Sequence, residues 1–317
     1  MIEIGGYFGL EKLINNEYHK GLIRLNTATN ALLYLLKAKG TKKVYIPYYL
    51  CNSVSEKLIK NEFEIEYYRI DSGFKPIISK VMDENEVLYI VNYFGQITNE
   101  EISLLKKKYR HIVMDNTHAF FQKPIFDVDT IYSCRKFFGV SDGAYLYTEK
   151  QVNDELEVDV SMDRMEHILG RFEGNASDYY SEFQKVDNIL QDLPIRLMSN
   201  LTHNLLGAID YESVRQIRNE NFEFLKKEFE EINLIQVDIP DGAFAYPFYI
   251  ENGIKIRREL AKKNLYIPTL WNNILKNTEE KSLEYRYSAN ILPIPCDQRY
   301  GVSDMEYITN LIKEVKR

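Results

Sequence analysis

The sequence predicts an α/β protein with a mostly parallel, doubly wound sheet, followed by a smaller C-terminal α+β domain. Two observations predict the sheet. From residue 20 to residue 148, short apolar runs alternate with segments of helical apolar spacing. Polar residues also cluster directly after the apolar runs, which is where open α/β sheets place ligand groups. We expect a large domain at residues 1–211 and a small domain at residues 212–317, since 317 residues can form two domains of ordinary size.

The expected elements of the large domain follow in regular order. The helix at 27–39 has apolar residues on one face, and the continuous apolar run at 87–92 is typical of a strand covered on both sides. The polar, acidic residues 151–191 predict helices but no strong strand. The expected strands are 43–47, 64–69, 87–92, 111–114, 129–132 and 145–148, and the helices are 27–39, 53–60, 99–108, 165–171 and 178–184.

The pattern changes after residue 191. Residues 193–209 have apolar helical spacing, and residues 211–232 predict one long amphipathic helix. Beyond it, short β-prone runs and helical segments alternate without the polar clusters of the first half. The expected strands are 235–240, 245–250 and 291–295, and the helices are 254–263 and 304–315.

Composition excludes several classes of protein. The 40 basic and 47 acidic residues give a net charge of −7, which disfavours nucleic acid or an anionic membrane as a partner. Three widely spaced cysteines and five histidines form no disulfide framework and no metal-binding spacing, so we expect no metal. No apolar run approaches the ~20 residues of a membrane span. We therefore expect a cytoplasmic protein that does not bind a membrane.

Lys136 is the most unusual residue of the chain. It lies between a β-prone run and a Gly/Ser/Asp turn, with Ser133 before it and Phe137 and Phe138 after it. A lysine in a largely apolar pocket has a lowered pKa, so its free amine can condense with an aldehyde to form a Schiff base. The alternative is a lysine at a strand end that extends to water.

Two further segments contain candidate site residues. Thr29 lies in a helix start rich in small and hydroxylated residues, which can bind a phosphate or can be an ordinary N-cap. Asp115 and His118 follow an apolar strand, where an acidic residue is either a ligand group or a helix cap. His118 is either part of the site or a core histidine.

Taken in order, these residues resemble a known class of proteins. Thr29, Asn92–Gly95, Asp115 with His118, Ser133 with Lys136, and Gly143 resemble the motifs of fold-type I pyridoxal-phosphate enzymes, whose fold is that of aspartate aminotransferase. Within that class the chain is most similar to the DegT-type sugar aminotransferase family. The match covers residues 20–150 well and the last hundred residues loosely, as in a divergent short member.

The resemblance implies roles for individual residues. Lys136 would bind pyridoxal 5'-phosphate covalently and act as general base and acid. Asp115 would pair with the pyridine nitrogen, and His118 would contact the 3′ oxygen or pack over that side of the ring. The phosphate would be held at the helix start; Arg135 could add charge there or form a surface ion pair. The implied phosphate-binding residues are Thr29, Ala28, Asn30 and Ser133.

The chain departs from the family pattern at several places. Cys51 stands where the family has an aromatic residue that stacks on the cofactor ring, and Tyr49 is an alternative for that contact. The polar middle also lacks the family's Asn-Tyr-Arg element. Tyr48, Trp271 and Arg299 are candidates for the substrate pocket, although each could instead belong to the core or to a dimer surface.

The resemblance implies a transferase that moves an amino group, with glutamate as the expected donor, to a nucleotide-linked keto-sugar in surface polysaccharide biosynthesis. It also implies a homodimer. Cys51 and the altered middle segment leave open a lyase, dehydratase or isomerase that uses the same cofactor. A non-catalytic scaffold homologue is a third alternative, which the presence of both Lys136 and Asp115 disfavours.

Overall fold

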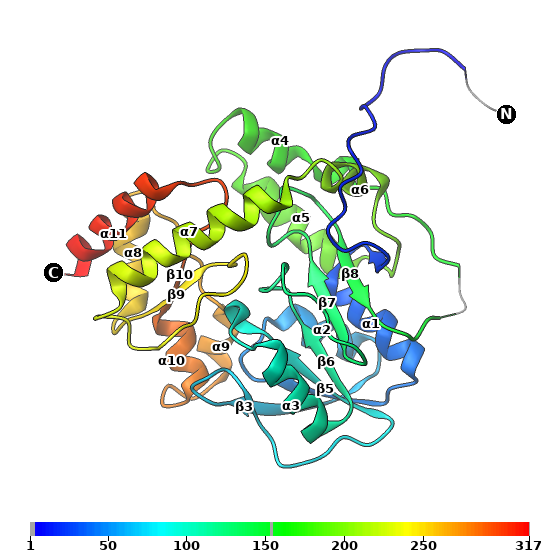
Figure 1. Cartoon of the computed structure of the whole chain (residues 1–317), viewed down its shortest axis with the longest axis horizontal. Helices are drawn as coiled ribbons and strands as arrows, with labels where there is room; N and C mark the ends of the chain where they lie inside the picture. The colour runs from blue at the N-terminus through cyan, green and yellow to red at the C-terminus, as the bar shows by residue number, and fades with distance from the viewer. Residues whose placement is uncertain (1–3, 153–154, 317) are drawn as a thin grey trace.

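A central sheet organises the molecule (Figure 1). The computed structural model describes residues 4–152 and 155–316. Among these residues, eight strands form the main sheet in the order β1-β8-β7-β6-β5-β2-β3-β4, and a second sheet pairs β9 with β10. The strands are β1 (Ile23–Leu25), β2 (Lys43–Pro47), β3 (Glu64–Ile70), β4 (Pro76–Ile77), β5 (Glu86–Val91), β6 (Ile112–Asp115), β7 (Asp129–Ser133), β8 (Ala144–Tyr147), β9 (Tyr246–Tyr249) and β10 (Ile291–Ile294).

The middle of the main sheet is parallel, as the sequence predicted. β3, β2, β5, β6 and β7 pair in parallel, and β8 is antiparallel to β7. Val91 pairs with Asp115, and Asp115 pairs with Ile131, so the carboxyl ends of β5, β6 and β7 lie side by side. Because carboxyl ends of parallel strands meet at one edge, the polar segments that follow these strands gather there.

Eleven α-helices are present in the described part of the chain. The first three alternate with the strands, whereas α4, α5 and α6 follow β8 and group together near the top of Figure 1. The helices are α1 (Ala28–Lys39), α2 (Asn52–Lys60), α3 (Asn99–Tyr109), α4 (Glu166–Glu173), α5 (Tyr180–Asp192), α6 (Asn200–Leu206), α7 (Tyr211–Phe229), α8 (Gly253–Lys262), α9 (Asn272–Asn277), α10 (Leu283–Asn290) and α11 (Val302–Lys316). None of the described helices is both long and apolar enough to cross a membrane.

The long helix α7 connects two hydrophobic clusters. Tyr211, at its start, packs with Phe120 and other aromatic residues beside the main sheet. Phe222 and Phe229, further along the helix, belong to a separate cluster that extends to Ile312 and includes β9 and β10. The C-terminal segment therefore has a core of its own, and this supports our proposal of a domain boundary at residue 211.

Two predicted elements were wrong. Residues 235–240 form no strand, because the side chain of Gln96 hydrogen-bonds the backbone of Asp238 in place of a neighbouring strand. Residues 193–209 are helical only over α6, because Pro194 precedes an extended segment in which Leu197 pairs with Leu25 and Val158. Four further elements, β1, β4, α9 and α10, were not predicted from the sequence.

Candidate active site

A cavity of 310 Å³ lies at the carboxyl edge of the parallel strands. Segments from six parts of the chain line it: the start of α1, the start of α2, the ends of β5 and β6, the loop between β7 and β8, the helix α5, and Trp271. Most of the predicted site residues meet here. Those that line the cavity are Ala28, Thr29, Cys51, Asp115, His118, Ser133, Lys136 and Trp271.

Asp115 forms part of the floor of the cavity. It is the last residue of β6 and accepts hydrogen bonds from the hydroxyl of Tyr89 at 2.5 Å and from the backbone N–H of Thr117 at 2.9 Å. Burial nevertheless raises the pKa of Asp115 above its ordinary value, although these two bonds and the charge of Lys136 oppose the shift. The carboxylate therefore lacks sufficient compensating positive charge in the protein alone.

His118 is held by aromatic stacking. Its ring lies 4.0 Å from that of Phe244 with an angle of 7° between the planes, and Trp271 lies parallel at 6.2 Å. Burial lowers the pKa of His118 to about 3, with a contribution from Lys136, so the imidazole is neutral at physiological pH. Its Nδ1 is buried and has no hydrogen-bond partner among the described residues.

The start of α1 is suited to an anion. Thr27 is the N-cap, and its side chain accepts a hydrogen bond from the backbone N–H of Asn30 at 3.0 Å. The first turn of α1 contains no acidic residue, and Thr27, Ala28 and Thr29 all line the cavity. The N-terminal end of the helix dipole therefore faces the cavity without a negative side chain from its own first turn.

Lys136 extends from the loop after β7 into the cavity, where its side chain remains accessible to solvent. The surrounding protein and the adjacent charge of Arg135 lower its pKa, so the free amine is more populated than in an ordinary surface lysine. Arg135 lines the same cavity and pairs with Asp187 of α5 at 3.3 Å. The structure thus places Arg135 in an ion pair at the edge of the cavity.

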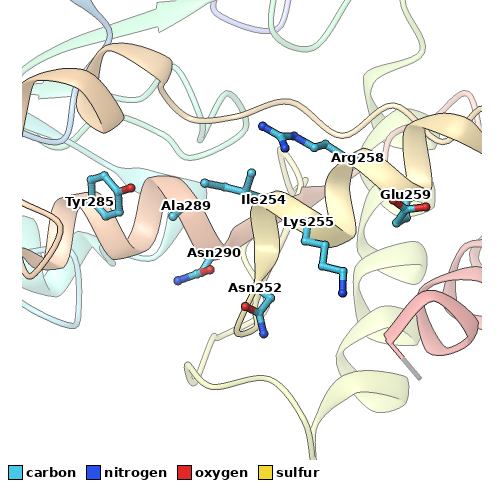
Figure 2. A pocket seen from close by; sticks show the side chains of 8 residues that line it. All are labelled: Asn252, Ile254, Lys255, Arg258, Glu259, Tyr285, Ala289 and Asn290. Carbon is cyan, nitrogen blue, oxygen red and sulfur yellow. The ribbon is translucent and has the colours of Figure 1, made fainter.

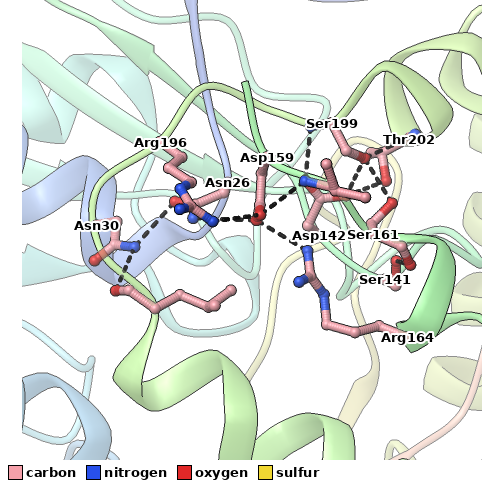
Figure 3. A network of polar contacts seen from close by, with 12 residues as sticks. Asn26, Asn30, Ser141, Asp142, Asp159, Ser161, Arg164, Arg196, Ser199 and Thr202 are labelled. Atoms are coloured by element: carbon pink, nitrogen blue, oxygen red, sulfur yellow. Dashed lines mark hydrogen bonds and ion pairs between the residues drawn. The ribbon is translucent and has the colours of Figure 1, made fainter. Parts of the chain in front are cut away.

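A buried polar network holds the loop after Lys136 against α1 and the middle of the chain (Figure 3). Asp142 accepts hydrogen bonds from the backbone N–H and the hydroxyl of Ser199, both at 2.8 Å, and from the hydroxyl of Thr202. Gly143 has a φ of +110°, and a Cβ there would lie 3.0 Å from Thr202, so this position requires glycine. Its N–H donates to the carbonyl of Asn26, next to the N-cap of α1, at 2.6 Å.

α5 forms a roof over the cavity. Asp187, Leu190 and Gln191 line it from this helix, and the sequence analysis did not predict any of them. Tyr89 and Thr117, which hold Asp115, were also missed. Thr117 could have been found from its place in the polar cluster after β6. Asp187 of α5 contacts Arg135 although the two residues are 52 positions apart in the sequence. No local pattern signals such a contact.

Four predicted residues are not among those that line the cavity. Tyr49 is fully buried behind Trp271, with their rings in an edge-on contact, so Cys51 occupies the cavity wall in its place. The side chain of Asn30 points to the carbonyls of Leu193 and Pro194. Outside the cavity, Tyr48 stacks on Tyr67 and Arg299 pairs with Asp297.

A larger groove of 490 Å³ lies elsewhere, on the surface of α8 and α10 (Figure 2). Its side chains come from Lys255, Arg258, Glu259, Tyr285 and their neighbours, and none of the predicted site residues lines it. Lys255 and Arg258 are exposed surface residues. The predicted site residues therefore point to the smaller cavity at the strand ends and not to this groove.

The chain has the fold of the fold-type I pyridoxal-phosphate enzymes, as predicted, and the solved structures that match it include several sugar aminotransferases. The solved structures that match include DesV of S. venezuelae, which is 12% identical over 93% of this chain and 85% of its own, with a TM-score of 0.63. PseC of Helicobacter pylori, an aminotransferase of pseudoaminic acid biosynthesis, is 15% identical over 92% and 85%, with a TM-score of 0.61. GDP-4-keto-6-deoxymannose-3-dehydratase (ColD) is 15% identical over 91% and 87%, with a TM-score of 0.60.

Two comparisons by sequence found no match. No family model matches the chain, and no curated protein matches it. Identities of 12–15% show the shared fold and leave the activity to be argued from the residues of the site.

The residues of the cavity fit pyridoxal phosphate. Asp115 is a buried carboxylate in need of a positive partner, which a protonated ring nitrogen would supply. The unsatisfied Nδ1 of His118 matches a ligand with a polar ring substituent. The start of α1 suits a phosphate, and Lys136 offers an amine of lowered pKa.

Proposed function

We propose that the chain is a pyridoxal-phosphate-dependent aminotransferase. One observation carries this proposal: an amine, a buried carboxylate and a helix N-terminus, contributed by Lys136, Asp115 and Thr29, line the same cavity at the carboxyl edge of the sheet. A binding protein would need neither the lysine nor the buried acid. The fold supports the proposal because it is the fold of sugar aminotransferases.

The residues of the cavity would have separate roles in such an enzyme. The cofactor, when bound, supplies an aldehyde and an electron-withdrawing ring. Lys136 would hold it through Nζ and would remove and return the proton at the substrate α-carbon. Asp115 would keep the ring nitrogen protonated, and neutral His118 would hydrogen-bond the ring oxygen. The amides at the start of α1, with the hydroxyls of Thr29 and Ser133, would hold the phosphate.

We further propose a nucleotide-linked keto-sugar as the amino acceptor and glutamate as the donor, in surface polysaccharide biosynthesis. The support is the similarity in fold to PseC and DesV, and PseC is described as an aminotransferase involved in the biosynthesis of pseudoaminic acid. Trp271, which lines the cavity, is the candidate for contact with the sugar. The cysteines at 51, 134 and 296 are unpaired, which supports a reducing compartment such as the cytoplasm.

The decisive experiment uses purified protein saturated with pyridoxal phosphate. We expect a visible absorbance band that borohydride treatment fixes to Lys136, with mass spectrometry of the tryptic peptide as the readout. Lys136→Ala should abolish the fixed adduct, whereas Lys123→Ala, which alters a lysine outside the cavity, should not. Protein that stays colourless with excess cofactor would refute the proposal. Glutamate should then convert the bound cofactor to its amine form.

A dehydratase is the second candidate, and Cys51 is the observation that favours it. A thiol in the cavity wall replaces the aromatic side chain expected from the aminotransferase family, and ColD shows that the same fold also carries a dehydratase. Mass spectrometry of the products separates the two reactions. An aminotransferase replaces the keto oxygen by an amino group, whereas a dehydratase removes a hydroxyl as water.

We also propose a homodimer. The N-terminal segment leaves the body of the molecule (Figure 1), and Ile4, Tyr7 and Phe8 are each at least 94% exposed. Fully exposed apolar side chains in sequence indicate a surface that a partner covers. Sedimentation analysis should show a dimer for the full chain, and removal of residues 1–10 should weaken it. A monomer at all concentrations would contradict the proposal.

A further inference from the structure

Four acidic or basic side chains line the cavity: Asp115, Arg135, Lys136 and Asp187. The proposed function assigns Lys136 and Asp115 to the cofactor. Arg135 is then the remaining cation and Asp187 the remaining anion in the described cavity wall. Once Lys136 is bound to the cofactor, Arg135 is the one positively charged side chain in the described cavity wall that a phosphate or carboxylate can contact.

The ion pair between Arg135 and Asp187 leaves the guanidinium largely unused. It is a single contact of 3.3 Å from Nη2 to one carboxylate oxygen, and the side chains are 22% and 54% exposed. Arginine has five N–H donors in a fixed fork that suits two oxygens of one anion. A solvent-accessible pair with one long contact contributes little stability, so an anion that binds through two oxygens can replace Asp187.

The pair is nevertheless held in place from both sides. On the roof, the carbonyl of Leu193, directly after α5, accepts hydrogen bonds from Lys57 at 2.7 Å and from Asn30 at 3.1 Å. On the floor, the N–H of Cys134 donates to the carbonyl of Gly143 at 3.0 Å, which fixes the strand end before Arg135. Asp187 and Arg135 therefore face each other because two anchored segments meet at the cavity.

We propose that Arg135 is the anion-binding side chain of this site and that Asp187 is its counter-ion in the ligand-free state. The ligand is an oxyanion, either the phosphate of the cofactor or a carboxylate of the amino acid substrate, and it displaces Asp187 from the guanidinium. This inference rests on the proposed function. No covalent bond is made or broken in the exchange: the guanidinium gives up the carboxylate of Asp187 and gains the oxyanion of the ligand.

Two titrations distinguish the two sources of the anion. The first compares pyridoxal phosphate with pyridoxal, which lacks the phosphate. The second adds glutarate, an unreactive dicarboxylate, to the cofactor-loaded protein. Trp271 is the one tryptophan of the chain and lines the cavity, so its fluorescence reports binding without any turnover, and calorimetry provides a second readout.

Arg135→Gln should lower the affinity for one of the two anions by about 10- to 100-fold. This is the range expected for loss of a charged hydrogen-bonding partner. Loss of the preference for pyridoxal phosphate over pyridoxal identifies the phosphate, and loss of glutarate binding identifies the carboxylate. Asp187→Asn should raise the affinity for the same anion by about two- to five-fold, because the competing carboxylate is gone. Arg215→Gln and Asp241→Asn, which remove a similar ion pair outside the cavity, are the matched controls.

The proposal is overturned if Arg135→Gln leaves the affinity for both anions as in the wild type, or if Asp187→Asn weakens them. Asp187 is on the exposed side of α5, so its variant remains informative if the arginine variant fails to fold. Failure of the proposed function has a different signature, since protein that never acquires the cofactor band fails that test before glutarate is added.

Discussion

The floor and the roof of the cavity are built in opposite ways. The floor comes from strand ends of the main sheet, and its key carboxylate, Asp115, is buried and accepts two short hydrogen bonds. The roof comes from α5, whose Asp187 is more than half exposed and makes one long contact to Arg135. The carboxylate of the floor is therefore held in a fixed position, whereas the roof can exchange its ion-pair contact at low cost.

This difference separates two tasks. A cofactor that stays bound needs preorganised partners, and buried groups with satisfied hydrogen bonds provide them. Substrates that enter and leave need contacts that can be exchanged. We therefore expect substitutions in the floor to impair the chemistry, and substitutions in the roof to alter the affinity for substrate.

The largest effect is expected for Asp115→Asn. Loss of the carboxylate should lower the rate by about 100-fold, because the ring nitrogen loses its charged partner. The same change should raise the thermal stability of the cofactor-free protein at pH 7. Burial raises the pKa of Asp115 in the folded protein, so the ionised carboxylate opposes folding. The stability that the neutral carboxyl provides is lost as the pH rises through this raised pKa.

An activity assay of the cofactor-loaded protein measures the first outcome, and calorimetry of the cofactor-free protein measures the second. Below the ordinary pKa of aspartate, wild type and variant should approach equal stability, since both side chains are then neutral. Asp163→Asn, an exposed position, is the control. A variant that is less stable than wild type at pH 7 without cofactor would show that the carboxylate is already compensated in the protein.

Asp142→Ala tests the connection between the loop after Lys136 and the start of α6. Asp142 and its partners on Ser199 and Thr202 are buried, so the change leaves several donors without an acceptor. We expect a loss of about 2 kcal/mol in the free energy of unfolding and weaker cofactor binding, since the loop carries Lys136 and Gly143. Urea denaturation measures the first effect. Asp178→Ala, at an exposed position, should change neither.

The sequence was sufficient to predict the strands that build the floor. Continuous apolar runs mark β5 and β6, and the predicted and observed ends differ by a residue or two. The edge strands β1 and β4 are only three and two residues long and carry no such pattern. The first five residues of α10 alternate between apolar or aromatic and charged side chains, a pattern that does not predict a helix. The structure shows that Ser282 caps this helix.

The same contrast governs the site residues. Asp115 and Lys136 follow predictable strands, so the topology alone brings them to one edge. Asp187 and Gln191 reach the cavity from α5, whose last turn and the residue after it are anchored through carbonyls that accept hydrogen bonds from Lys57 and Asn30. Those contacts join residues more than a hundred positions apart, and no local spacing predicts them.

Acid should destabilise the floor through His118. Its pKa is lowered to about 3 by burial, so the unfolded chain binds a proton that the folded protein excludes. Stability is fully present above about pH 6.5 and should fall by about 1.4 kcal/mol for each pH unit below it. His118→Phe should make this dependence shallower in urea titrations between pH 5 and 6.5. Curves that stay parallel to the wild type there would contradict the buried neutral state.

The smallest effect is expected where the roof is anchored. The ammonium of buried Lys57 donates to the carbonyls of Gln191 at 3.0 Å and Leu193 at 2.7 Å, so Lys57→Met should cost about 1 kcal/mol of stability. The affinity for glutarate should rise by up to several-fold while the affinity for cofactor stays unchanged, because a less firmly anchored α5 makes Asp187 a weaker competitor for Arg135 and leaves the floor as it is. Lys60→Met is the matched control, since this neighbouring lysine pairs with the exposed side chain of Asp192. Equal loss of cofactor and glutarate in Lys57→Met would mean that roof and floor are one rigid unit, and the division between them would have to be abandoned.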